Sequence, residues 1–427
     1  MKVLIVGGGG REHAIALKIK ENPEVTALYA APGNGGIAQI ATCLPFKATD
    51  VDGIVRWAAE NKVDFVIVAP DDPLCLGMVD ALAEQGIPAF GPRKNAAIIE
   101  GSKVFSKNLM KKYGIPTAAY ETFDDYDEAV KYLQTADMPI VVKADGLALG
   151  KGVLICPDRE SAVEAVASMM KEAKFGASGA RVVIEEFLTG PEVSVLAFTD
   201  GKTVKPMVSS MDHKRALDHD EGLNTGGMGT IAPNPCYTPE LAQRCMDEIF
   251  LPTIAAMNAE GRTFTGCLYF GLMMTPKGPK VIEYNCRFGD PETQVVLPLL
   301  KSDLLTIMRA TVDGTLADTP VEFTSGAACC VVLASGGYPV SYKSGYPISG
   351  LDEAGKTATV FHAGTKLVDG QIVTAGGRVL GVTATADTLE AAIDKANQAA
   401  DKITFTDMHM RRDIGQRALA SRKESHS

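Results

Sequence analysis

The sequence has no run of about 18 apolar residues, the length that a transmembrane helix needs, so we expect no membrane partner. None of its nine cysteines forms a CxxC pair, and only Cys329 and Cys330 are adjacent. This pattern is typical of buried thiols in a reducing compartment rather than of a disulfide or zinc framework. We therefore expect a cytoplasmic protein.

Basic residues are fewer than acidic ones. The chain has 42 Lys and Arg against 52 Asp and Glu, a net charge of −10. Nucleic-acid backbones select basic surfaces, so no nucleic-acid partner is expected, although a few local donors can still bind a small anion. The N-terminal segment MKVLIVGGGG has neither the long apolar region nor the cleavage site of a signal peptide, and none is expected.

The pattern along 427 residues predicts three regions and an α/β fold, α+β over the whole chain. Residues 1–102 alternate short apolar strands with helices, which predicts βαβ units and a Rossmann-like parallel sheet. Residues 103–324 mix strands with longer helices, and residues 325–427 have short strands between Gly-rich turns, which predicts a small β-rich domain that packs back on the first. Single helices are expected over Pro73–Gln85 and Thr238–Asn258.

A Gly-rich turn, Gly7 to Gly10, follows the first strand and opens a helix. Such a turn lets the backbone approach an anion, and the free N–H groups of the helix start can bind it. A dinucleotide site would need an acidic residue after the second strand, and that region, LYAAPGN, has none. A single phosphate is favoured over NAD, with a plain packing turn as the alternative. The loops that contain Asn34 and Asp71 should lie at the same sheet edge.

Two lysines, Lys143 and Lys151, bracket a Gly-rich loop between two strands. It lacks the GK[ST] of a Walker A loop, but it could fold over a polyphosphate. Lys143 ends an apolar strand, where a purely solvated lysine is less expected. A solvated hairpin is the alternative.

The strand VIEYNCRFGDPE, residues 281–292, carries the most informative polar residues. Strand alternation places Glu283, Asn285 and Arg287 on one face, and Ile282, Tyr284 and Cys286 on the other. Carboxylate and amide oxygens suit Mg²⁺, and a neighbouring arginine can neutralise a phosphoryl group in transfer. Two features are weaker. The first is the acidic run at Glu185. The second is the cluster DHKR at 212–215 with the loop NTGGMG at 224–229, and this second segment is either a mobile surface loop or a substrate-closing loop.

Taken together, these residues resemble the ATP-grasp ligases, and within them the phosphoribosylamine–glycine ligase family. GGGGREHA at 7–14, PGN at 32–34, NTGGMG at 224–229 and RFGDPE at 287–292 stand as that family has them, and the likeness runs from Met1 to about Leu419. It implies an ATP-grasp domain over 103–324 with a lid at about 118–190. Because the chain ends after one such module, we expect no further fused enzymes.

The resemblance implies that ATP, glycine and 5-phosphoribosylamine give ADP, phosphate and glycinamide ribonucleotide through glycyl phosphate, in a monomer or dimer. Mg²⁺ or Mn²⁺ is the implied cofactor, with Glu283 and Asn285 as ligands and with Arg287 and Lys143 as catalytic residues. The preceding strand, Cys267–Met274, has no acid, so a second metal ion is less certain. The implied ATP-binding residues are Lys103, Lys143, Gly146, Lys151, Gly152, Glu185, Glu186, Phe187, Leu188 and Glu192. The expected substrate-binding residues are Gly8, Gly9, Gly10, Asn34, Asp71, Asp212, Lys214, Asn224, Gly226, Gly227 and Asp290.

Three rival functions stay open at this point. A purine-pathway ATP-grasp ligase that activates another small acid shares the architecture. A Rossmann-type oxidoreductase lacks support because no acid follows the second strand. A non-catalytic nucleotide sensor would have little use for the polar face of Glu283, Asn285 and Arg287.

Overall fold

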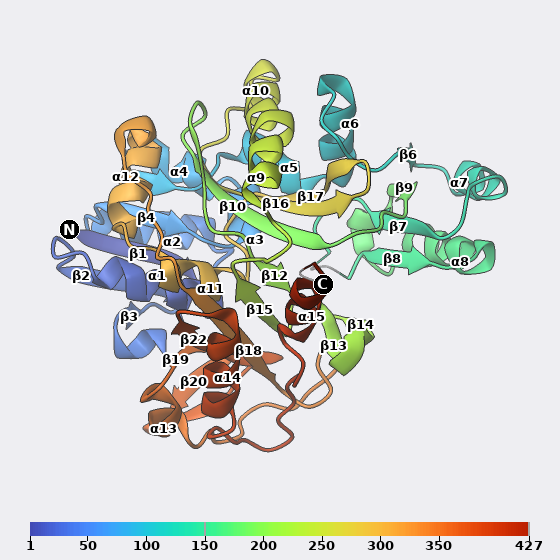
Figure 1. Ribbon diagram of the computed structural model, residues 1–427. Helices are drawn as coiled ribbons and strands as arrows, with labels where there is room; N and C mark the ends of the chain where they lie inside the picture. The colour runs from blue at the N-terminus through green and yellow to red at the C-terminus, as the bar shows by residue number, and fades with distance from the viewer. Residues whose placement is uncertain (149–150, 426–427) are drawn as a thin grey trace.

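The first hundred residues form a parallel sheet, as the alternation of strands and helices predicts (Figure 1). A computed structural model describes residues 1–148 and 151–425. The sheet order is β3-β2-β1-β4-β5, and all neighbours are parallel. Its strands are β1 (Lys2–Gly7), β2 (Ala27–Pro32), β3 (Thr42–Cys43), β4 (Phe65–Val68) and β5 (Ala89–Phe90). The loops after β1 and β4 therefore flank the point where strand order reverses, which is where α/β sheets bind ligands.

Alternate residues of β1 face two different cores. Leu4 and Val6 belong to one core with α2 (Val51–Glu60) and α4 (Met78–Glu84), whereas Val3 and Ile5 belong to a second core with α1 (Gly10–Lys20). The sheet is thus covered on both faces. Because both faces are buried, successive residues of its strands are apolar.

The single helix expected over Pro73–Gln85 is wrong. The structure has α3 (Asp71–Cys75) and α4 instead, separated by Gly77 with a left-handed φ of 87°. Glycine takes this conformation without steric cost and so ends α3 after little more than one turn. Asp71, expected in a loop, begins α3. Next along the chain come α5 (Lys94–Gly101) and α6 (Lys103–Tyr113).

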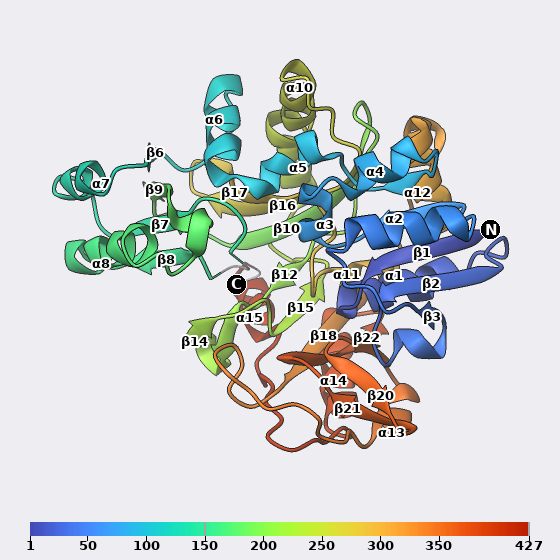
Figure 2. The same ribbon diagram turned by 180° about the vertical axis from the view of Figure 1, so that it is seen from behind.

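The region predicted as a lid, about residues 118–190, projects from the body as a separate small unit, drawn in teal and green at one side of Figures 1 and 2. Its sheet has the order β6-β9-β7-β8, and its own core includes Val142 and Ile184. The elements are β6 (Tyr120–Phe123), α7 (Tyr126–Leu133), β7 (Ile140–Ala144), β8 (Val153–Cys156), α8 (Arg159–Met170) and β9 (Val182–Glu186).

A second, four-stranded sheet lies against α5 and α6, in the order β11-β10-β16-β17. Its strands are β10 (Glu192–Thr199), β11 (Val204–Pro206), β16 (Gly266–Thr275) and β17 (Gly278–Asn285). The helix expected over Thr238–Asn258 is not continuous. A π-helical turn, Met246–Phe250, separates α9 (Pro239–Cys245) from α10 (Leu251–Ala259).

The C-terminal region builds a five-stranded antiparallel sheet, in the order β12-β15-β18-β22-β19. Two of its strands, β12 (Met211–Asp212) and β15 (Gly229–Ala232), come from before residue 325, so this sheet crosses the expected boundary. The other strands of this sheet are β18 (Ala327–Ala334), β19 (Thr359–His362) and β22 (Arg378–Ala386). Two hairpins lie beside it, β13 (Arg215–Leu217) with β14 (Glu221–Asn224) and β20 (Thr365–Val368) with β21 (Gln371–Thr374). The helices of this region are α11 (Thr293–Val296), α13 (Leu351–Gly355), α14 (Leu389–Ala400) and α15 (Gln416–Ser425). By contrast, α12 (Leu304–Asp313) packs against β5, α1 and β16.

As predicted, this region lies against the first domain. The backbone N–H of His362, at the end of β19, donates to Nδ1 of His13 on α1 at 2.8 Å. Among the described helices, none is long and apolar enough to cross a bilayer.

Candidate active site

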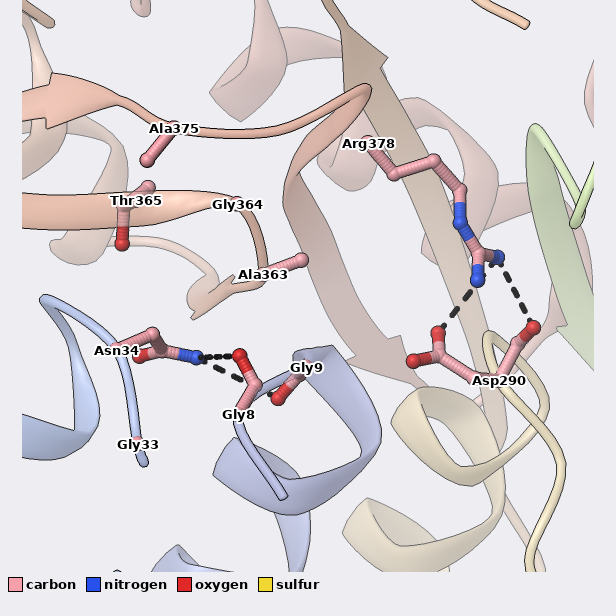
Figure 3. Close-up of a pocket in the computed structure, with 10 residues that line it drawn as sticks. All are labelled: Gly8, Gly9, Gly33, Asn34, Asp290, Ala363, Gly364, Thr365, Ala375 and Arg378. Atoms are coloured by element: carbon pink, nitrogen blue, oxygen red, sulfur yellow. Dashed lines mark hydrogen bonds and ion pairs between the residues drawn. The ribbon is translucent and has the colours of Figure 1, made fainter. Parts of the chain in front are cut away.

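A cavity of about 340 Å³ opens at the carboxyl edge of the N-terminal sheet, between that sheet and the C-terminal region (Figure 3). The loops after β1 and β2 form one wall, and the chain around β20 and β22 forms the other. Its lining residues are Gly8, Gly9, Gly33, Asn34, Asp290, Ala363, Gly364, Thr365, Ala375 and Arg378. The cavity thus unites Gly8, Gly9, Asn34 and Asp290, four residues predicted to contact substrate.

The amides at the start of α1 are less available than predicted. Gly9 N donates to the Glu12 carboxylate at 2.8 Å, and Arg11 N donates to Asp290 Oδ2 at 3.3 Å. The expectation that this helix start offers only free N–H groups is therefore wrong for these two amides, because carboxylates of the chain already cap them. Gly8 packs against the carbonyl of Gly33, where any β-carbon would approach within 2.4 Å.

Asn34 holds the two Gly-rich loops together. Its amide nitrogen donates to Gly8 O at 3.0 Å and to His362 O at 2.8 Å, while its amide oxygen accepts from Gly36 N and Ile37 N. Figure 3 shows this side chain beside Gly8 and Gly9. Every polar atom of the amide is thereby used to shape the cavity.

Arg378 was not identified from the sequence, yet it organises the opposite wall. Its guanidinium donates to the carbonyls of Gly226 and Asp290, both at 2.9 Å. Gly227 has a φ of 124°, and a β-carbon there would lie 2.6 Å from a carboxylate oxygen of Asp212. The NTGGMG loop therefore needs glycine at this point to pass close to Asp212. Burial, and then the nearby Glu292 carboxylate, raise the pKa of Asp212.

A second, narrower cavity lies along β10, β16 and β17. Its lining residues are Glu192, Val193, Ser194, Lys214, Tyr269, Gly271, Leu272, Ile282 and Glu283. It brings three predicted site residues together, Glu192, Lys214 and Glu283, with Lys214 Nζ 3.5 Å from Glu283 Oε1. Asn224 ends β14, next to Thr225, whose hydroxyl donates to Lys214 O at 2.8 Å.

The strict alternation predicted for β17 is broken at Ile282. Val281 pairs with Leu272 but Glu283 pairs with Gly271, so a bulge lies between them. Ile282 lines the second cavity together with Glu283, whereas Tyr284 and Cys286 are in the core. The predicted common face for Ile282, Tyr284 and Cys286 is thus wrong for Ile282, because the bulge adds one residue to this strand.

Glu283 is surrounded by positive charge. Burial disfavours its ionised form, but Lys214, Lys143, Lys103 and Arg287 lower the pKa of the carboxyl below its usual value. In the orientation that its surroundings require, the Asn285 amide nitrogen donates to Tyr284 O and Glu100 Oε1, so the amide oxygen points the other way. The side chain of Glu283 keeps 30% of its surface exposed. An oxygen pair of this kind fits a hard divalent cation. Within the described residues no three His, Cys, Asp or Glu form a metal cluster, so water or substrate oxygens would complete the shell.

Arg287 follows the end of β17 and pairs with Glu100 at 3.0 Å, a buried partner that sequence reasoning missed. Burial opposes the charge of the guanidinium, but Glu100 and then Asp71 raise the pKa of Arg287. Asp71, expected with the substrate loops, thus lies near Arg287 and is absent from the lining of the first cavity. Within the described chain, Nε of Arg287 is buried without a hydrogen-bond partner.

The predicted nucleotide residues gather where α6 meets the lid. Lys103 Nζ donates to Gly146 O at 2.9 Å, and Lys143 pairs with Glu185. Glu185, one of the predicted ATP-binding residues, is only 5% exposed and lies between Lys143 and Lys107. Glu186 accepts a hydrogen bond from Ala119 N at 3.1 Å, and the half-buried Phe187 and Leu188 follow it.

The glycine loop predicted to close over the phosphates runs from Gly146 to Gly152. Lys151 on it is exposed and Gly152 is buried. Two of its positions, 149 and 150, lie outside the described residues.

Three family models match consecutive parts of the chain. The phosphoribosylglycinamide synthetase N domain matches residues 1–100, the ATP-grasp (A) domain 101–293 and the C domain 328–417. The chain belongs to the phosphoribosylglycinamide synthetase family. The family resemblance inferred from the sequence motifs is thereby confirmed, and the oxidoreductase alternative is not supported.

Relatives match this family member over nearly its whole length. It is 49% identical to the phosphoribosylamine–glycine ligase of Halalkalibacterium halodurans over 425 residues, 100% of this chain and 99% of that protein. The Caldanaerobacter subterraneus ligase is 48% identical, with 97% and 99% covered. The crystal structure of the Thermotoga maritima ligase has a TM-score of 0.86 at 34% identity, covering 97% and 100%. A biotin carboxylase domain from Hydrogenobacter thermophilus, solved with MgADP and bicarbonate, has a TM-score of 0.72 at 18% identity, covering 96% and 91%, and shares the fold.

Proposed function

We propose that this chain joins glycine to 5-phosphoribosylamine, converting ATP to ADP and phosphate and forming glycinamide ribonucleotide for purine synthesis. The observation that carries the proposal is the short segment from Glu283 to Asp290, which connects the two cavities. Glu283 lines one and Asp290 lines the other, so groups bound in the two cavities can meet along this segment. The full-length likeness to phosphoribosylamine–glycine ligases supports the choice of substrates.

ATP binds between the lid and β17 in this proposal. Lys103 and Lys143 contact its phosphates, and the exposed Lys151 closes over them from the loop. Glu186, Phe187 and Leu188 frame adenine, and Glu192 at the start of β10 accepts the ribose hydroxyls. Lysines so placed act by position and charge, which is what a loose phosphoryl transfer requires.

Mg²⁺ or Mn²⁺, when bound, would neutralise phosphate charge and help to align the γ-phosphoryl group. Glu283 and Asn285 would hold it, because their oxygens are the hard ligands available on β17. Lys214, which pairs with Glu283 here, would then be released toward substrate.

The carboxylate oxygen of glycine attacks the γ-phosphorus, the bond to ADP breaks, and glycyl phosphate forms. No protein nucleophile is needed, because the substrate carboxylate is the nucleophile. Arg287 stabilises the developing charge on the phosphoryl oxygens. Its guanidinium has five N–H donors, of which two are used on Phe288 O and Glu100 Oε1, so it keeps donors for this task.

Phosphoribosylamine binds in the first cavity, with its phosphate near Gly8, Gly9 and Gly10 and its amine toward Asp290. The amine attacks the carbonyl carbon of glycyl phosphate, and the bond from that carbon to the phosphate oxygen breaks. The nitrogen loses one proton, which the departing phosphate takes up, and the amide forms. Asn34 shapes the loops, Arg378 closes the opposite wall, and Asp212 with the loop of Gly226 and Gly227 bounds the path between the two cavities.

The test is phosphate release from ATP in the presence of phosphoribosylamine and a panel of small carboxylic acids. Glycine should stimulate release strongly, and formate, bicarbonate and alanine should not. Stimulation by formate or bicarbonate but not by glycine would assign the chain to another reaction of the same architecture.

A further inference from the structure

Lys107 is a buried lysine with no role in the mechanism above. It lies on α6, one helical turn after Lys103, so the two share a helix face. Its side chain is only 4% exposed. Lysine is almost never so deeply buried unless its charge is paired, so the partners of Lys107 indicate what it does.

The Lys107 ammonium lies among three oxygen atoms of the chain. Nζ lies 2.8 Å from Glu185 Oε2, and it donates to Thr117 Oγ1 at 2.7 Å and to Ala118 O at 3.2 Å. Two of the three ammonium N–H groups therefore donate to the chain, and the contact with Glu185 is an ion pair. A side chain so deeply enclosed has almost no surface to offer a ligand.

Lys143 shares the same carboxylate but makes fewer hydrogen bonds than Lys107 within the described chain. It pairs with Glu185 Oε1, and among the described residues its one further hydrogen bond is a long one of 3.4 Å to Ile282 O. Burial disfavours the charge of Glu185, but Lys143 and then Lys107 lower the pKa of that carboxyl, so it stays ionised. Two cations and one anion, each at most 6% exposed, thus form a buried trio of net charge +1.

We propose that Lys107 is a positioning residue for nucleotide binding: by holding one oxygen of Glu185, it prevents that carboxylate from neutralising Lys143. The inference rests on the proposed function, because it takes Lys143 as a phosphate ligand. With Lys107 present, Lys143 can turn toward a phosphate while Glu185 keeps a cationic partner. Without it, the departure of Lys143 would leave a buried, unpaired carboxylate, which is strongly unfavourable.

The alternative is a purely structural role at the base of the lid. Thr117, which accepts from Lys107, in turn donates to Val281 O at 2.7 Å, so Lys107 also ties α6 to β17. The two roles differ in one respect. A structural tie depends on the hydrogen bonds, whereas the positioning role depends on the charge of the trio.

The experiment therefore varies that charge. Lys107→Met lowers the net charge of the trio from +1 to 0, and Lys107→Met with Glu185→Gln restores +1. We would measure the Kd for ADP with Mg²⁺ by calorimetry, and the KM for ATP and for glycine in turnover. Lys107→Met should weaken nucleotide binding about tenfold, equivalent to about 1.4 kcal/mol, and leave the KM for glycine nearly unchanged. The double variant should recover most of that loss.

The matched control is Lys111→Met, which removes an exposed lysine one turn along the same helix and should leave the Kd for ADP unchanged. If Lys107→Met fails to fold by circular dichroism, Lys107→Gln makes the same charge change and can still donate to Thr117. Unchanged ADP binding in the neutral variant, or a double variant that binds no better than the single one, would overturn the inference. Both outcomes are separate from failure of the proposed function, which would appear as absence of glycine-dependent turnover in the unsubstituted enzyme.

Discussion

Arg378 donates a hydrogen bond to the backbone carbonyl of Asp290 at 2.9 Å, which joins β22 of the C-terminal region to the turn after β17. The same guanidinium lies 3.7 Å from the Asp290 carboxylate and donates to Gly226 O at 2.9 Å. Figure 3 shows it directly above Asp290 at the edge of the first cavity. Three segments distant in sequence are thus fixed by one side chain.

Arg378→Lys should raise the KM for phosphoribosylamine about tenfold and leave the KM for ATP nearly unchanged. Lysine keeps the charge but lacks the planar fork that reaches several carbonyls at once, so the cavity wall should loosen. Steady-state kinetics with each substrate varied would measure both constants. Arg412→Lys, at a 56% exposed arginine paired with Asp401, is the control and should change neither. Equal increases in both constants would show that Arg378 acts on the whole fold.

Gly9→Val should raise the KM for phosphoribosylamine and leave that for ATP nearly unchanged. A β-carbon at Gly9 would lie 2.9 Å from Glu12 Oε2 and 3.2 Å from Asp290 Oδ2, so a branched side chain must displace carboxylates at the cavity. The kinetics would be measured on a variant shown to be folded by circular dichroism. Gly355→Ala, where a β-carbon meets nothing within 4 Å, is the control. A rise in the KM for ATP alone would mean that the two phosphate sites are assigned the wrong way round.

Glu283→Gln should lower turnover about 10- to 100-fold at limiting Mg²⁺, with part of the loss recovered at high Mg²⁺. The amide removes the one negative charge that the pair of Glu283 and Asn285 offers a cation. The measurement is the Mg²⁺ dependence of phosphate release. An unchanged dependence would show that Glu283 is not a ligand.

The sequence predicted the parts of the site that are local. The turn from Gly7 to Gly10 and the strand before it are contiguous, and a run of apolar residues followed by glycines indicates both. By contrast, the bulge at Ile282 depends on how β17 pairs with β16. The register of that pairing cannot be predicted from the sequence of one strand alone. The break at Gly77 was missed because the apolar spacing continues across it.

Residues brought in by tertiary contacts were also missed. No local sequence signal distinguishes Arg378 from other strand residues, because its role depends on the position of β22 beside the turn at Asp290. Likewise, Glu100 lies in no motif that would indicate its pairing with Arg287. Lys107 had one available signal, its spacing of four from Lys103. Glu185, by contrast, was singled out from the sequence. Its acidic run suggested a side chain that faces a ligand, but in the structure two lysines enclose it.

The last prediction concerns acid stability, where two buried histidines join the N-terminal and C-terminal regions. The rings of His13 and His362 are 5.6 Å apart, and His13 Nδ1 accepts a hydrogen bond from His362 N. Burial, and then the neighbouring ring, lower the pKa of His13 to about 3, and burial lowers that of His362 to about 4. Both are neutral in the folded chain near pH 6, while the unfolded chain takes up protons below pH about 6.5.

The unfolded state therefore binds more protons, so the free energy of unfolding should fall as pH drops from about 6.5 toward 4, by about 1.4 kcal/mol per pH unit for each histidine. His13→Asn should lower stability at neutral pH, because the packing is lost, but reduce the steepness of the acid loss by one histidine's share. Urea unfolding at a series of pH values would measure this, provided that unfolding is reversible. His219→Asn, at an exposed histidine with a left-handed φ of 61° that asparagine tolerates, should leave the steepness unchanged. If His13→Asn loses stability in acid as steeply as the unsubstituted chain, His13 is not one of the groups that take up the proton.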